Sequence, residues 1–194
     1  MRNPIRLKNL SLRLAPLYLL GALLWFFASP TAGSLLAGGL LVVLGLSFRA
    51  WGVGYLVKTE RLAIYGPYAY VRNPLYLGTL LVGCGFSFML GGWVGPLGLV
   101  SFGLWFGLSY FPRKERIESE RLRVRYGDIY GHYHANVPAL WPRFPAWRPE
   151  AELLDQLADD RRWQLQRYDA NNELGTFLAC VAGMGFVAFR LFLA

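Results

Sequence analysis

The chain has 194 residues, of which 55% are hydrophobic and only 16% carry a formal charge. This composition and a mean hydropathy of +0.31 exclude an ordinary soluble domain and indicate an integral membrane protein. The net charge of +8 would suggest a nucleic-acid partner in a soluble protein. Here the basic residues lie between apolar segments, where they set topology and meet anionic lipid headgroups, so we expect no nucleic-acid partner.

The first two apolar segments are predicted to cross the membrane. Residues 14–28 follow a basic N-terminal stretch, and we interpret them as an uncleaved first span. Residues 34–57 are long enough, at about 1.5 Å per residue, to cross a hydrocarbon core of roughly 30 Å. Arg49 is the one charge well inside this second segment. It is either a functional residue, or a structural one that pairs with a partner or snorkels toward Lys58.

Residues 66–78 concentrate features that a lipid-facing hairpin does not need. Pro67 and Pro74 disfavour helix in the residue before them, so a helix should restart at Pro74 with Asn73 at its N-cap. Four tyrosines surround this N-cap: Tyr65, Tyr68, Tyr70 and Tyr76. A helix N-terminus beside the guanidinium of Arg72 and several phenols suits a carboxylate or phosphate joined to a flat ring. The alternative is a membrane re-entry turn with a snorkelling arginine and an interfacial tyrosine belt.

Two further apolar runs, residues 75–90 and 93–111, are joined by two glycines at 91–92. A connection of this length predicts a helical hairpin. Acids and bases alternate over residues 113–125, so this stretch is not a membrane span. We expect the fourth helix to continue from the bilayer into solvent and to end at Gly127.

The end of the chain completes the predicted topology. Residues 150–169 are polar and predict a surface helix, and residues 174–193 are apolar and predict a final span. If the spans alternate, every basic connection falls on one face, which the positive-inside rule makes cytoplasmic. The sequence therefore predicts an all-α, polytopic membrane helical bundle of about five transmembrane helices, with the N-terminus cytoplasmic and the C-terminus outside.

The predicted hairpin brings the two unusual stretches together on the cytosolic side. The residues expected to meet there are Arg72, Asn73, Tyr76, Glu118 and Glu120. Two carboxylates near an arginine and a helix N-terminus can clasp a zwitterionic amino-acid moiety, while tyrosine faces can hold a heterocycle or a sulfonium. The alternative for the glutamates is a solvated helix whose charges pair at i,i+4 spacing.

Four short motifs follow one another over about residues 65–143. They are R-N-P-L-Y-L-G at 72–78, R-I-E-S-E-R-L at 116–122, Y-G-D-I-Y-G-H-Y at 126–133 and V-P-A-L-W-P at 137–142. In their order, and in the hairpin between the first two, they resemble the isoprenylcysteine carboxyl methyltransferase and phospholipid methyltransferase superfamily. The resemblance implies S-adenosylmethionine as methyl donor, enclosed at the cytosolic side, and a membrane lipid or a prenylated small molecule as acceptor.

The resemblance carries over residue by residue. Arg72, Pro74 and Tyr76 match the family's first block, and Glu118 matches the first acid of its Glu-Glu pair. Asn73 stands where the prenyl-cysteine enzymes have histidine, but it is similar to the phospholipid enzymes and to many bacterial members. The acceptor group, a carboxyl or an amine, is therefore left open.

The candidate site residues follow from this match. Ser119 stands where the family has its second acid, and Glu120 is the candidate substitute. The candidate catalytic residues are Arg72, Asn73 and Glu118. The candidate cofactor-binding residues are Tyr65, Gly66, Tyr68, Arg72, Asn73, Pro74, Tyr76, Glu118 and Glu120.

His132 or His134 is a candidate base for an amine acceptor, although such a pair is more often simply interfacial. We expect no metal site, because two histidines and two distant cysteines have no ligand spacing.

These predictions divide the chain into three regions. Residues 1–60 are an N-terminal two-helix membrane region, 61–148 a catalytic hairpin with a cofactor-binding segment, and 149–194 a polar surface helix with a C-terminal span. The predicted function is S-adenosylmethionine-dependent methyl transfer to a lipid or prenylated acceptor in the cell membrane, a bacterial inner membrane by resemblance. Two alternatives stay open: an NADPH-dependent sterol-type membrane reductase, which needs a longer set of spans, and a non-enzymatic membrane scaffold.

Overall fold

The computed structural model describes residues 15–56, 62–149 and 162–193. Within these ranges every regular element is a helix and no β-strand forms, so the predicted all-α class is confirmed. The elements are α1 (Ala15–Phe26), α2 (Ala32–Val53), the 3-10 helix η3 (Gly66–Ala69), α3 (Pro74–Leu90), α4 (Val94–Trp105), the π-helix η4 (Phe106–Tyr110), α5 (Phe111–Asn136), α7 (Leu165–Ala170) and α8 (Glu173–Leu191).

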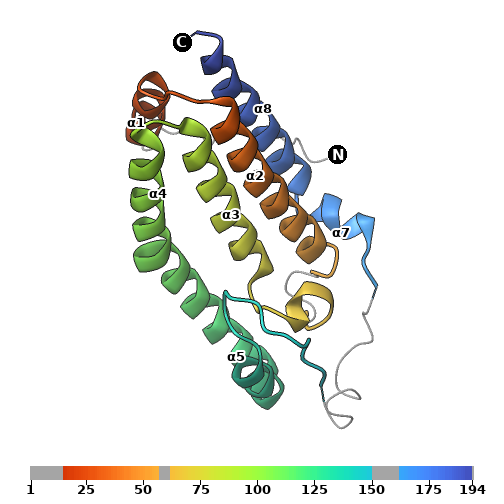
Figure 1. The fold of residues 1–194 in the computed structure, drawn as a ribbon. Coiled ribbons are helices and arrows are strands. Elements are labelled where there is room, and N and C mark those ends of the chain that lie inside the picture. The colour runs from red at the N-terminus through yellow and green to blue at the C-terminus, as the bar shows by residue number, and fades with distance from the viewer. Residues whose placement is uncertain (1–14, 57–61, 150–161, 194) are drawn as a thin grey trace.

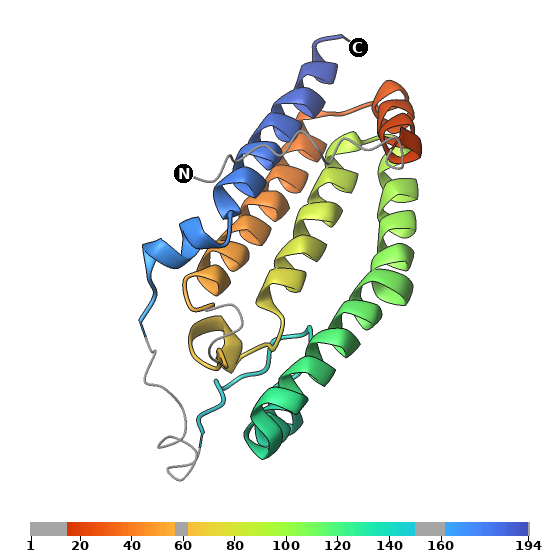
Figure 2. The same cartoon turned by 180° about the vertical axis from the view of Figure 1, so that it is seen from behind.

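Helices α8, α2, α3 and α4 lie side by side in that order (Figures 1 and 2). The turn between α3 and α4 is made at Gly91, whose φ of 64° is readily adopted only by glycine. The predicted hairpin is therefore confirmed. α1 lies at this end of the bundle, while η3 and the second half of α5 lie at the opposite end.

Small residues let α2 and α3 approach until their backbones touch. A Cβ atom added to Gly45 would lie 2.6 Å from the carbonyl oxygen of Gly78, and one added to Gly78 would lie 2.6 Å from that of Gly45. Gly38 and Gly85 make the same reciprocal contact further along the two helices. Close packing of this kind is the usual way in which helices associate in a membrane, where apolar burial gives little net drive.

Replacing Gly45 with alanine should therefore separate α2 from α3. We expect Gly45→Ala to lower the free energy of unfolding in detergent by about 1–3 kcal/mol, the usual cost of overpacking. Gly39→Ala is the matched control, because no atom lies within 4 Å of a Cβ at Gly39 on the same helix. Equal stability of the two variants would contradict the packing described above.

Three described helices are long and apolar enough to cross a membrane. They are Ala32–Val53, the continuous helix Val94–Asn136, and Glu173–Leu191. Two of the five expected spans are too short by this measure. Helix α3 has 17 residues, or about 25 Å, and the described part of α1 has 12 residues, or about 18 Å. By length and composition, the described residues thus supply three candidate spans, with α3 and the described part of α1 as shorter apolar helices.

The fourth span runs on into the polar helix, as predicted, but it does not end at Gly127. Helix α4 continues through the π-helix η4 into α5, which reaches Asn136. Gly127 has φ 51° and ψ −127°, so the helix breaks direction there and then resumes. The correction has a simple cause: a left-handed glycine interrupts a helix but does not prevent the next residues from forming another.

The C-terminal part of the chain is attached to α2. Arg49 forms an ion pair with Glu173 at the start of α8, with 2.6 Å between Nη2 and Oε1. Of the alternatives given for Arg49, the structure therefore shows the one in which it pairs with a partner, Glu173. The predicted surface helix at residues 150–169 lies mostly outside the described residues, and the described part contains α7.

Candidate functional site

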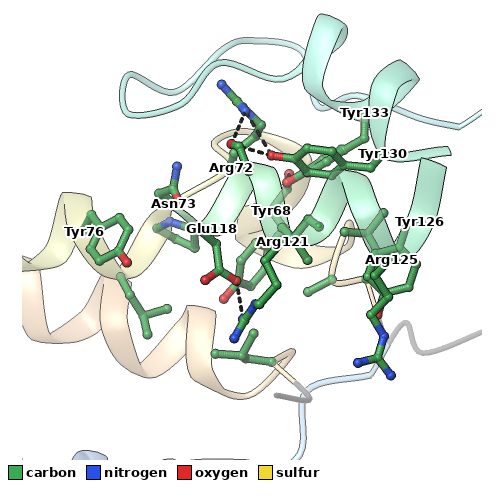
Figure 3. A pocket seen from close by; sticks show the side chains of 17 residues that line it. Tyr68, Arg72, Asn73, Tyr76, Glu118, Arg121, Arg125, Tyr126, Tyr130 and Tyr133 are labelled. Atoms are coloured by element: carbon green, nitrogen blue, oxygen red, sulfur yellow. Dashed lines mark hydrogen bonds and ion pairs between the residues drawn. The ribbon is translucent and has the colours of Figure 1, made fainter. Parts of the chain in front are cut away.

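A cavity of about 400 Å³ lies where the start of α3 faces α5. Its walls come from Leu56, Leu62 and Ala63, from side chains within residues 68–76, and from α5 side chains between Glu118 and Tyr133 (Figure 3). A volume of this size is within the range of small-molecule sites, which is typically about 300–1,000 Å³. We call it the α3–α5 cavity.

The proline pattern determines the backbone at this site. Helix α3 begins at Pro74 with Asn73 at its N-cap, in a non-helical conformation of φ −124° and ψ 65°, so the predicted helix start is confirmed. The Asn73 side chain does not cap the helix. Its Nδ2 donates instead to the carbonyl oxygen of Ala139 at 3.0 Å. The residue that begins α3 is thus also tied to the segment after α5.

Residues 69–72 pair with the segment that returns from α5. Three backbone hydrogen bonds join them: Arg72 N to Pro138 O at 2.8 Å, Arg143 N to Tyr70 O at 2.9 Å, and Trp147 N to Ala69 O at 2.8 Å. The hydroxyl of Tyr133 donates to the carbonyl oxygen of Tyr68 at 2.8 Å. The V-P-A-L-W-P motif therefore serves to hold the R-N-P motif, a role that the sequence did not reveal.

Arg72 takes part in a closed ring of polar contacts. Its Nη1 lies 3.1 Å from Glu115 Oε1 and donates to the Tyr130 hydroxyl at 3.3 Å. Tyr130 donates to Ser119 Oγ at 2.7 Å, and Ser119 donates back to Glu115 at 2.9 Å. The Arg72 side chain is only 10% exposed. Its Nε is buried and finds no hydrogen-bond partner among the described residues.

Glu115 is the partner of Arg72, and the sequence analysis missed it, although Glu115 itself does not line the cavity. The acid expected beside Arg72 was Glu118, which instead pairs with Arg121 at 2.7 Å on the more exposed side of α5. One signal was available, because Glu115 and Ser119 stand four residues apart and such positions share one face of a helix. Beside Arg72, the Ser119 hydroxyl thus donates to a carboxylate one turn earlier on the same helix.

Most of the predicted site residues meet in one place. Those that line the α3–α5 cavity are Tyr68, Arg72, Asn73, Pro74, Tyr76 and Glu118. Tyr65 and Gly66 precede this group and are not part of the lining, and Glu120 is exposed and points elsewhere on α5. His132 and His134 do not line the cavity either. The catalytic and cofactor-binding roles of all these residues stay predictions.

The cavity has a basic lining and a neutral phenol at its base. Arg72, Arg121 and Arg125 line it, against the single carboxylate of Glu118. Burial raises the pKa of the Tyr68 hydroxyl well above its ordinary value, and the nearby Glu118 carboxylate adds to this shift. The Tyr68 hydroxyl therefore stays protonated. Among the described residues no group of His, Cys, Asp and Glu side chains could hold a metal ion.

Comparison with known proteins agrees with the family resemblance at a coarse level. The chain is 33% identical over 113 residues to the Protein-S-isoprenylcysteine O-methyltransferase of Schizosaccharomyces pombe. The match covers 58% of this chain and 46% of that protein, so the chain spans about half the length of the curated relative it matches. No family model matches the chain, and no solved structure matches it. The match indicates similarity to an O-methyltransferase.

The polar ring makes a prediction about stability. Glu115→Ala removes the carboxylate that pairs with the Arg72 guanidinium and accepts from the Ser119 hydroxyl, so we expect the free energy of unfolding in detergent to fall by about 1–3 kcal/mol. Glu120→Ala removes a carboxylate from the exposed side of the same helix and should change stability by no more than about 0.5 kcal/mol. Chemical unfolding of both variants would measure this difference, and a larger loss for Glu120→Ala would refute the assignment.

Proposed function

We propose that this chain is a membrane-embedded methyltransferase that uses S-adenosylmethionine and acts on a lipid or prenylated acceptor. The observation that carries the proposal is the meeting of the R-N-P-L-Y-L-G and R-I-E-S-E-R-L motifs at one cavity. The two motifs are far apart in sequence, and the hairpin of α3 and α4 brings both to this cavity. The identity to the fission-yeast O-methyltransferase supports the same reaction class.

The cavity residues fit the amino-acid end of this cofactor. The buried Arg72 Nε lacks a partner among the described residues and is a donor suited to a carboxylate. Glu118 is the carboxylate at the cavity that would accept from an ammonium group, and the rings of Tyr68 and Tyr76 offer faces for a sulfonium or a heterocycle. When bound, S-adenosylmethionine supplies an electrophilic methyl group.

The protein's own contribution would be position and the exclusion of water. Holding donor and acceptor in line can lower a barrier by up to roughly 7–11 kcal/mol when the geometry is close to ideal. Buried side chains such as Tyr130 and Tyr133, each 2% exposed, would keep water from one wall of the cavity. No proton needs to leave a carboxylate acceptor before it attacks.

A carboxylate is the acceptor that this cavity favours. Its lining contains three arginines and one glutamate, which suits an anion better than an ammonium group. An amine acceptor would need a base, but the two histidines do not line the cavity, and His134 lies 3.8 Å from Glu115 instead. The printed name of the relative also describes methyl transfer to oxygen.

The proposed location is a cell membrane, with the cavity on the cytoplasmic side. The cavity lies at the end of the bundle where α5 carries its many charges, and the positive-inside rule places such an end in the cytoplasm. The cytoplasmic N-terminus stays a prediction from the sequence, because residues 1–14 lie outside the described residues. A bacterial inner membrane is the setting that the family resemblance suggests.

Cofactor binding tests the proposal directly. Calorimetry of the detergent-solubilised chain should detect S-adenosylhomocysteine and no NADP, and Arg72→Ala and Glu118→Ala should each weaken binding by about 1.5–3 kcal/mol, the value of a charge-assisted hydrogen bond. Arg113→Ala, an exposed arginine earlier on α5, is the control and should bind normally. Binding of NADP alone would support the reductase, and binding of neither would leave the scaffold.

The acceptor group can be identified from the chemistry of the product. With labelled S-adenosylmethionine, we expect transfer to an S-prenylated N-acetylcysteine with a free carboxylate, and none to phosphatidylethanolamine. The transferred label should be released by mild base as methanol, because base hydrolyses a methyl ester but leaves a methylamine intact. A base-stable label on the amine lipid would contradict the carboxyl assignment.

A further inference from the structure

Arg49 and Glu173 form a doubly hydrogen-bonded ion pair inside the bundle. Arg49 donates from Nε to Glu173 Oε2 at 3.0 Å and from Nη2 to Oε1 at 2.6 Å. The two side chains are 16% and 7% exposed. Moving two charges out of water costs desolvation free energy, and the attraction between them usually offsets little more than that cost. Stability alone is therefore a weak reason for this pair. Its remaining contacts suggest a different role.

The third nitrogen of Arg49 reaches the first turns of α3. Nη1 donates to Thr79 Oγ1 at 2.8 Å and to the carbonyl oxygen of Leu75 at 3.3 Å. Thr79 in turn donates to Leu75 at 2.9 Å. Leu75 lines the α3–α5 cavity, between Pro74 and Tyr76. A continuous chain of polar contacts therefore leads from α8 to the cavity wall.

The segment before α8 holds a second part of that wall. It donates to three carbonyl oxygens in the last turn of α2 and just after it: Trp163 Nε1 to Ala50 O at 3.0 Å, Gln164 N to Gly54 O at 3.0 Å, and Asn171 Nδ2 to Leu56 O at 3.3 Å. Ala50 O also accepts from the C-cap nitrogen of Gly54 at 3.3 Å, so these bonds join the segment before α8 to the last turn of α2 and to the residues that follow it. Leu56 also lines the cavity.

We propose that Arg49 and Glu173 are positioning residues, through which the C-terminal helix α8 holds the first turns of α3 as a wall of the cofactor cavity. Arg49 touches the cavity-lining turn from behind, and Glu173 fixes the orientation of its guanidinium. As far as the cavity binds S-adenosylmethionine, this inference rests on the proposed function. The claim that Arg49 and Glu173 hold the first turns of α3 does not depend on that function.

Thr79→Val is the variant that tests this inference, because it breaks the link to α3 and leaves both charges paired. We expect faster amide hydrogen exchange over residues 74–80 and, from the loss of one hydrogen bond, S-adenosylhomocysteine affinity that is lower by about two- to tenfold. Ser87→Ala is the matched control. It removes a similar bond, Ser87 Oγ to Gly83 O at 2.9 Å, further along the same helix and away from the cavity.

Glu173→Gln provides a second variant, which keeps an acceptor for Arg49 and removes the charge. It should speed exchange over residues 74–80 in the same direction, and should lower cofactor affinity without preventing binding. If this variant fails to fold, Thr79→Val decides the question by itself. Exchange and affinity that match the Ser87→Ala control in the Thr79→Val variant would overturn the inference.

The two proposals can fail separately. If the unaltered chain binds no S-adenosylhomocysteine, the proposed function is wrong, and hydrogen exchange alone then decides the positioning role. Faster exchange over residues 74–80 in Thr79→Val than in Ser87→Ala supports it, and equal exchange refutes it. If the unaltered chain binds but Thr79→Val binds equally well, the function stands and the positioning role is wrong.

Discussion

The site depends on the hydrogen bonds between residues 69–72 and the segment that follows α5. Pro67 and Pro74 prevent a continuous helix here, so the backbone groups between them need partners elsewhere. Arg72 N and Tyr70 O find those partners at Pro138 and Arg143. The returning segment can reach them because Gly127 breaks the direction of α5. Two motifs separated by a membrane hairpin are thereby joined into one wall.

Two largely buried arginines contact the start of α3 and the residues before it. Arg72 precedes the helix and is bound by Glu115, Ser119 and Tyr130 of α5. Arg49 of α2 contacts the helix from behind and is bound by Glu173 of α8. Each guanidinium is paired within the protein, yet the Nε of Arg72 is left without a partner among the described residues. Arg72 thus lines the cavity, while Arg49 contacts the carbonyl oxygen of Leu75 in the first turn of α3.

Helix periodicity explains which acidic residues of α5 reach the site. Residues two apart on an α-helix point about 200° away from each other, so Glu118 and Glu120 cannot both face one cavity. The structure places Glu118 at the cavity and Glu120 on the exposed side. Glu115 and Ser119, four residues apart, share the face that meets Arg72. A linear motif does not show the direction in which each side chain of a helix points, which is why the motif suggested Glu120.

The sequence by itself determined the class of this protein, because apolar runs, prolines and glycines act locally. They predicted an all-helical membrane bundle, the hairpin at Gly91, the start of α3 at Pro74 and the meeting of two motifs. Only the tertiary structure decided that Glu115 binds Arg72 and that Glu173 binds Arg49. Those partners are set by how far each helix is rotated about its axis when it packs. That rotation depends on contacts between residues that are distant in the chain.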